Sequence, residues 1–114
     1  MNHDMIIFSK TYDFIAWLMP QSMKFPRSQR FVVTKRLQDA ALNFYENINH
    51  ANRFRNQHRR RYLFSADLEL DAVNFYLRLV HNWNWLSDGQ YAHAAKMTTE
   101  LGRLLGGWIK STQT

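Results

Sequence analysis

The sequence predicts an all-α protein: an antiparallel up-down-up-down four-helix bundle that forms one domain over residues 1–114. Three observations lead to this fold class. The 4 glycines and 2 prolines are too few for a chain rich in β-turns, whereas 46% hydrophobic residues suffice for a core. Apolar residues recur at helical spacing through four segments. The breaks between the segments are short, and short connections place successive helices antiparallel.

The first predicted helix runs from about Ser9 to Met23. Its apolar face consists of Tyr12, Ile15, Leu18 and Met19. Residues 24–26 should form a turn, because the residue before a proline is pushed out of the α region. Proline also suits the first turn of a helix, so we expect the second helix to begin between Pro26 and Ser28.

The second helix carries one continuous apolar stripe in steps of three and four: Val33, Leu37, Ala40, Phe44, Ile48 and Ala51. A second apolar flank, made of Phe31, Leu42 and Tyr45, is wider than one neighbouring helix requires, and a contact between subunits would use it. We place the following turn within residues 52–61, because like charges three or four residues apart destabilise a helix.

The third and fourth helices are read in the same way. The third has the stripe Leu63, Ala66, Leu70, Val73, Leu77 and Val80, with a flank of Phe64, Leu68, Phe75 and Leu79, and it ends near residues 82–85. Ser87 and Gln90 match a capping box, which predicts the start of the fourth helix. The Gly106-Gly107 pair either ends this helix or lets Trp108 fold back.

Positive charge is concentrated in one region of the chain. Residues 24–61 contain ten Lys and Arg but only Asp39 and Glu46 as acids, a net of +8 against +6 for the whole chain. A regional excess of arginine suits phosphate contacts, although a solvated turn is the ordinary explanation of a charge run. In the predicted topology residues 53–61 crowd one end of the bundle and residues 24–30 the other. The candidate binding residues are Arg27, Lys35, Arg36, Arg53, Arg55, Arg59, Arg60 and Arg61.

Catalytic and metal-binding patterns are missing from the sequence. The absence of cysteine excludes disulfides, thiol catalysis and cysteine-bound zinc. A di-iron bundle needs more glutamates than Glu46, Glu69 and Glu100, and there is neither a phosphate-binding loop nor a nucleophile elbow. We therefore expect no enzyme, no cofactor and no metal. Without a cationic leader or an apolar run of about 20 residues, we expect a cytoplasmic protein that does not enter a membrane.

Four stretches of the chain resemble the accessory variability determinant (Avd) proteins of diversity-generating retroelements. They are residues 12–20 (YDFIAWLMP), 24–32 (KFPRSQRFV), 86–95 (LSDGQYAHAA) and 101–110 (LGRLLGGWIK). The resemblance covers nearly the whole chain. The aromatic HNWNW stretch at residues 81–85 departs from the pattern of most members.

The resemblance implies a four-helix protomer that assembles into a homopentameric barrel with a positively charged surface. It implies as partners the retroelement's reverse transcriptase and its template RNA or cDNA, which the protein would bind as a non-catalytic accessory during mutagenic retrohoming. The bundle proteins encoded by intervening sequences in ribosomal RNA genes share the fold and the Phe-Pro helix start. A structural or oligomeric bundle of that type, binding RNA or an acidic protein, is therefore the alternative.

Overall fold

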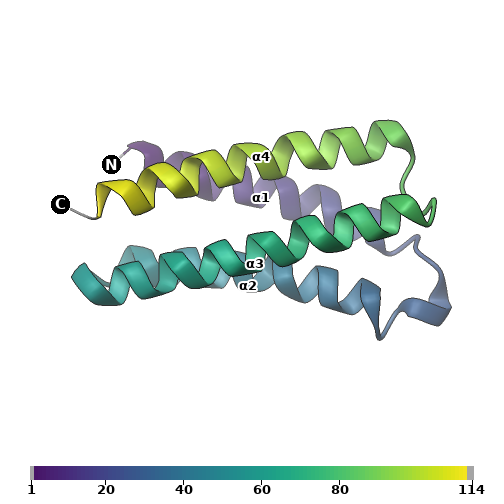
Figure 1. The fold of residues 1–114 in the computed structure, drawn as a ribbon, viewed down its shortest axis with the longest axis horizontal. Helices are drawn as coiled ribbons and strands as arrows, with labels where there is room; N and C mark the ends of the chain where they lie inside the picture. The colour runs from purple at the N-terminus through teal and green to yellow at the C-terminus, as the bar shows by residue number, and fades with distance from the viewer. Residues whose placement is uncertain (1, 113–114) are drawn as a thin grey trace.

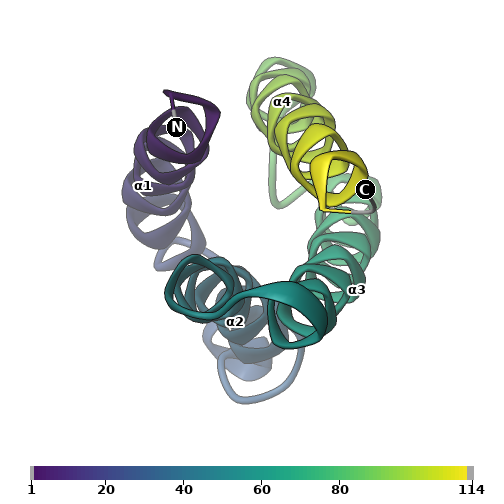
Figure 2. The same cartoon turned by 90° about the vertical axis from the view of Figure 1, so that its left-hand side faces the viewer.

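The computed structural model describes the backbone of residues 2–112 and the side chains of residues 6–112. The described residues form four α-helices and one short 3-10 helix: α1 (Asn2–Ser22), η1 (Arg27–Gln29), α2 (Val33–Arg53), α3 (Asn56–Asn82) and α4 (Asp88–Ser111). Successive helices run in opposite directions along a body of 45 × 25 × 19 Å (Figure 1). Viewed end-on, they follow one another in chain order (Figure 2), and α1 also packs against α4. The predicted all-α four-helix bundle is confirmed.

The core consists of the apolar stripes that periodicity predicts for α2 and α3. All six stripe residues of each of these helices are buried. Helix α4 adds a third stripe of buried residues: Ala94, Thr98, Leu101, Leu104, Leu105 and Trp108. Burial of each large apolar side chain contributes roughly 1.5–3 kcal/mol relative to its exposed state, so the stripes hold the helices together.

Helix α1 differs from the prediction in its start and in its buried face. It begins at Asn2 instead of Ser9, and Tyr12 is 74% exposed. The buried face is Ile7, Thr11, Phe14, Leu18 and Ser22. This face includes two polar residues, but hydroxyls can be buried when they are hydrogen-bonded. Thr11 Oγ1 donates to the Ile7 carbonyl at 2.7 Å, and Ser22 Oγ donates to the Met19 carbonyl at 3.0 Å.

Two further predicted boundaries are wrong. Helix α2 begins at Val33 instead of between Pro26 and Ser28, because only the 3-10 turn η1 forms directly after the proline. Helix α4 continues through the glycine pair to Ser111, since Trp108 is buried in the core as a helical residue. The capping box is confirmed: Ser87 Oγ accepts from the Gln90 N–H at 3.1 Å, and the Ser87 N–H donates to Gln90 Oε1 at 2.8 Å.

The turn between α2 and α3 is much shorter than the predicted residues 52–61. Only Phe54 and Arg55 lie between the two helices, and both are extended. The chain then reverses at Asn56, whose φ of 58° is a left-handed conformation that asparagine tolerates better than most residues. Arg59, Arg60 and Arg61 are therefore part of the first turns of α3.

Candidate nucleic-acid interface

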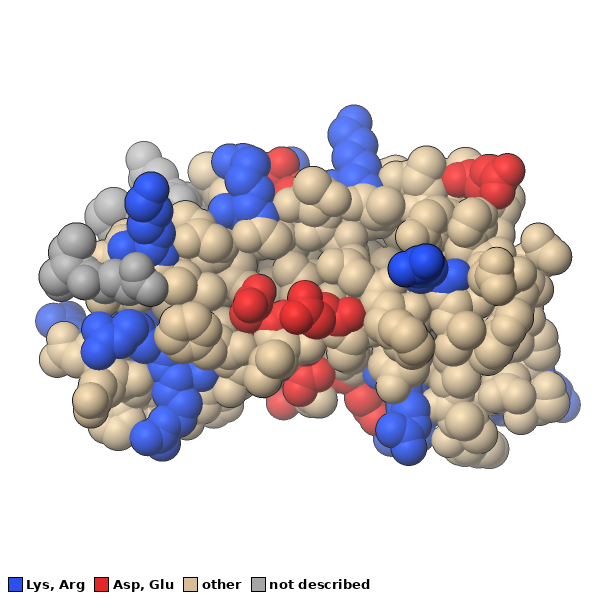
Figure 3. All heavy atoms as spheres, viewed as in Figure 1, with Lys and Arg blue, Asp and Glu red and all other residues tan. Residues whose placement is uncertain are grey.

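The eight basic residues that the sequence singles out form two groups at opposite ends of the bundle. Residues 53–61 surround the α2–α3 turn, whereas Arg27 lies in η1 and Lys35 and Arg36 lie in the first turn of α2. Helix α2 separates the groups by roughly 30 Å at about 1.5 Å per residue. Figure 3 shows Lys and Arg gathered at the end that carries the α2–α3 turn, with acidic residues across the middle. We call Arg53, Arg55, Arg59, Arg60 and Arg61 the arginine cluster.

Two members of the arginine cluster bind the ends of other helices. Arg59 Nε donates to the Ala51 carbonyl at 2.8 Å, and its guanidinium lies 5.9 Å from the ring centroid of Trp108. Arg60 Nη1 donates to the Thr112 carbonyl at 3.0 Å. These carbonyls belong to the C-terminal ends of α2 and α4, which carry partial negative charge and lack helical partners. Both arginines are half-buried, so they fix the geometry of this end before any partner arrives.

The other three members, Arg53, Arg55 and Arg61, are exposed. Their side chains make no hydrogen bond or ion pair with another residue whose side chain the structure describes. No Asp or Glu occurs between Glu46 and Asp67, so the sequence offers no compensating charge nearby. Three guanidinium groups, each able to bind a phosphate through two parallel hydrogen bonds, therefore face solvent at one end.

Aromatic side chains lie beside these arginines. The rings of His50 and Tyr62 are stacked with centroids 5.0 Å apart, and those of Phe54 and Tyr62 are stacked at 5.4 Å. His58 packs against Phe54 at 5.9 Å. Sequence reasoning missed this ring cluster (His50, Phe54, His58 and Tyr62), although its members stand at regular steps of four residues. The short turn brings them together from two helices.

The basic group at the opposite end is smaller. Arg27 and Arg36 are exposed, and neither makes an ion pair with a described residue. Lys35 Nζ lies 2.6 Å from Asp39 Oδ2, one helical turn along α2. Such an exposed pair contributes only about 0.3–0.5 kcal/mol, but it compensates the charge of Lys35. With Arg30, which is also exposed and directly follows η1, this end offers three guanidinium groups without an ion pair among the described residues.

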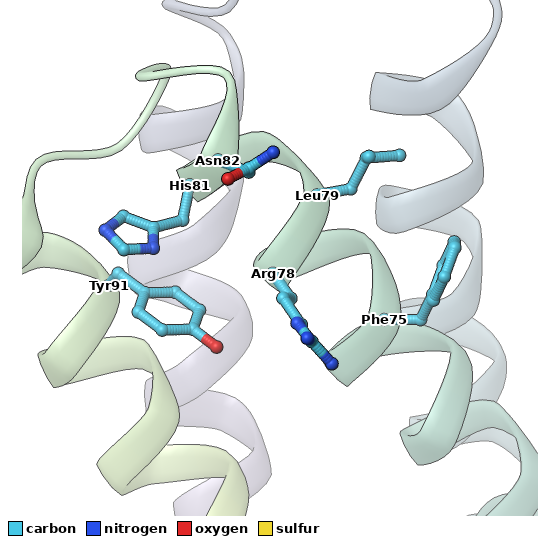
Figure 4. A pocket seen from close by; sticks show the side chains of 6 residues that line it. All are labelled: Phe75, Arg78, Leu79, His81, Asn82 and Tyr91. Atoms are coloured by element: carbon cyan, nitrogen blue, oxygen red, sulfur yellow. The ribbon is translucent and has the colours of Figure 1, made fainter.

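A hollow of about 420 Å³ between α3 and α4 lies near the aromatic stretch of residues 81–85 (Figure 4). His81 and Tyr91 stack on one wall with centroids 4.2 Å apart, and His81 Nε2 lies 2.8 Å from Asp88 Oδ1. Trp83 is 41% exposed, whereas Trp85 packs against Phe25 at 5.4 Å. This stretch thus joins α3 to α4 and covers the core.

Apolar side chains are uncovered in several places on the described protomer: around η1 (Met23, Phe31 and Val32), between α1 and α2, and along α3. Between α1 and α2 lies a hollow of about 370 Å³ lined by Phe8, Tyr12, Ile15, Leu42 and Tyr45. Along α3 stands a row of exposed apolar side chains: Phe64, Leu68 and Phe75. Leu68 is 69% exposed. Contiguous apolar patches are uncommon on the surface of monomers, so these positions are the ones to test for a contact between copies.

Fold and site together define a basic four-helix-bundle protein that has exposed arginines at both ends and an arginine cluster around the α2–α3 turn. The chain belongs to the bAvd-like family, whose model matches residues 5–112, and this confirms the resemblance found in the sequence. It is also similar to a crystal structure from Bacteroides thetaiotaomicron VPI-5482, a protein of unknown function from the S23 ribosomal protein family. The TM-score is 0.86 at 21% identity, and the match covers 95% of this chain and 98% of that one. At this identity the likeness concerns the fold alone.

The search of curated proteins gave no match. Among the described helices, none combines the length and the apolar character needed to cross a membrane. Within the same residues, no three His, Asp or Glu side chains converge in a way that could hold a metal ion.

Proposed function

We propose that this protein is a non-catalytic accessory subunit that binds a retroelement reverse transcriptase and its template RNA or cDNA, in support of mutagenic retrohoming. The single observation that carries the proposal is the group of three exposed, uncompensated arginines at one end of a bAvd-like bundle. Since a reverse transcriptase and its template are intracellular molecules, the proposal places the protein in the cytoplasm.

The members of the arginine cluster have different tasks in this proposal. Arg53, Arg55 and Arg61 bind phosphates or acidic groups of the polymerase, and each phosphate contact releases counterions and so adds salt-dependent affinity. Arg59 and Arg60 hold the α2–α3 end against the C-termini of α2 and α4. Arg27, Arg36 and the paired Lys35 provide a second, weaker basic area at the opposite end.

The proposal includes a homopentamer, and two of the uncovered apolar surfaces support it. The hollow between α1 and α2 and the row along α3 differ in shape, so one can receive the other from the next copy. Such a head-to-tail contact closes into a ring when the rotation that relates one copy to the next divides a full turn evenly. Cyclic symmetry would then place the arginine cluster of every copy on the same rim, where five sets of three free arginines add their fields.

Light scattering tests the assembly. Five copies of the 13.7 kDa chain have a mass of about 68 kDa. Leu68→Asp places a charge in the exposed row on α3 and should give monomers of unchanged helicity. Ala92→Asp, on an exposed position of α4, is the matched control and should leave the mass unchanged. A wild-type mass of one protomer at micromolar concentration contradicts the pentamer.

Co-purification with the reverse transcriptase, with and without nuclease treatment, tests the partner. Replacing the three free arginines by glutamine should abolish capture. The control removes the same number of charges from exposed residues outside both basic areas: Lys10→Gln, Arg78→Gln and Lys96→Gln. Capture that survives nuclease indicates direct contact with the polymerase. An oligomer that captures no polymerase, with or without RNA, supports the alternative of a structural bundle.

A further inference from the structure

The ring cluster lies directly among the free arginines. Phe54 stands between Arg53 and Arg55 in the turn, and Tyr62 follows Arg61 in α3. The planes of Phe54 and Tyr62 are 17° apart, so these rings form a stacked pair. Phe54 is 41% exposed, and His50 and His58 are exposed as well. This end therefore combines cations with open aromatic surface.

An arginine surface without rings favours duplex nucleic acid. The phosphate density of a duplex is higher, and each neutralised phosphate contributes more to the salt dependence of binding in a duplex than in a single strand. The ring cluster reverses this preference. A base can stack on a protein ring only when it is unpaired and accessible, as it is in a single strand or a loop.

We propose that this end binds single-stranded nucleic acid, with an unpaired base stacked on the exposed ring of Phe54 and the flanking phosphates on Arg53, Arg55 and Arg61. The inference rests on the proposed function, because it presumes that nucleic acid binds at the arginine cluster. The inference adds that the bound nucleic acid is single-stranded. Tyr62 supports the Phe54 ring from α3, and His50 of α2 stacks in turn on Tyr62, so the stacking surface is formed before the ligand arrives.

Fluorescence anisotropy of an oligouridine that contains one 2-aminopurine tests the inference against a duplex of the same length. We expect the single strand to bind more tightly than the duplex, because stacking on one aromatic ring contributes about fivefold or more and so outweighs the electrostatic advantage of the duplex. The 2-aminopurine fluorescence should fall on binding. The corresponding deoxyoligonucleotide should behave alike, because stacking does not require the 2′-hydroxyl.

Phe54→Leu keeps an apolar side chain but removes the ring. It should weaken single-strand binding about fivefold or more and abolish the fluorescence change, while duplex binding stays the same. The control is Trp83→Leu, which removes an equally exposed ring at the opposite end of the bundle. It should change neither the affinity for the single strand nor the 2-aminopurine fluorescence change. Phe54→Tyr retains the ring and should retain binding. The wild-type comparison of single strand with duplex needs no variant and holds even if Phe54→Leu does not fold.

The outcomes separate this inference from the proposed function. Equal or tighter binding of the duplex, with no effect of Phe54→Leu, overturns the inference. The proposed function then still stands if neutralising Arg53, Arg55 and Arg61 abolishes binding of both ligands. The absence of salt-dependent binding to either ligand overturns both.

Discussion

Arg59 and Arg61 are separated by one residue, yet the structure predicts opposite consequences of replacing them by alanine. Arg59 donates to the last turn of α2 and lies over Trp108, whereas the exposed Arg61 side chain makes no hydrogen bond or ion pair with a described residue. Arg59→Ala should therefore lower the free energy of unfolding, and Arg61→Ala should lower the affinity for nucleic acid. A purely solvated arginine run would make the two variants equivalent.

The loss of unfolding free energy expected for Arg59→Ala follows from the two contacts that Arg59 makes. A hydrogen bond from a charged donor contributes about 1.5 kcal/mol when half-exposed, at the lower end of its range. The contact with Trp108 adds about 0.5 kcal/mol at such a site. Arg59→Ala should thus lower the free energy of unfolding by about 2 kcal/mol. For a chain of this size that lowers Tm by about 8 °C. Arg61→Ala should change the free energy of unfolding by less than about 0.5 kcal/mol.

Thermal unfolding, followed by circular dichroism, gives the Tm of both variants. The protein concentration must be the same throughout, because assembly shifts Tm. The same preparations then enter an anisotropy titration with single-stranded RNA at several salt concentrations. Arg61→Ala should reduce the slope of log affinity against log salt by about 0.7. Equal shifts in Tm for the two variants, or a larger shift for Arg61→Ala, refute the reasoning.

Three further changes have definite expected outcomes. Ser87→Ala removes the capping box of α4 and should lower the free energy of unfolding by about 1 kcal/mol, measured by chemical denaturation. Ser28→Ala in η1 is the control and should lower it little. Equal losses for the two variants would contradict the stabilising role of the cap. Gly107→Ala should stabilise the protein by about 1 kcal/mol, because its Cβ meets no atom within 4 Å; a lower Tm would mean that another copy covers this face. Lys35→Ala should lower stability by less than about 0.5 kcal/mol at low salt, and a larger loss contradicts the exposed pair with Asp39.

The parts of the fold that sequence predicts correctly are those with one dominant pattern. The stripes of α2 and α3 run without interruption along each helix, whereas their second apolar flanks are shorter, and every stripe residue is buried as expected. The capping box of Ser87 and Gln90 is a local motif and needs no tertiary information. Helix α1 offers two apolar registers, and the one that is buried contains Thr11 and Ser22. Only the hydrogen bonds of these hydroxyls make that face suitable for the core.

The candidate site was harder to predict because its contacts join different helices. Repulsion between like charges predicts a long turn, but Arg59 and Arg60 reach the C-terminal carbonyls of α2 and α4, which favours helix at these positions. The ring cluster arises only when the short turn places His50 and Phe54 beside Tyr62. Sequence could identify the basic segment, but not which arginines are free within it.

We propose that the free arginines Arg53, Arg55 and Arg61 bind nucleic acid. The most direct measurement is the affinity for single-stranded RNA across a salt series, for the wild type and for the variant with all three replaced by glutamine. We expect a linear fall of log affinity with log salt in the wild type, and a slope smaller by about 2 in the variant, at about 0.7 per lost contact. A flat salt response in the wild type, or the same slope in both proteins, would contradict it.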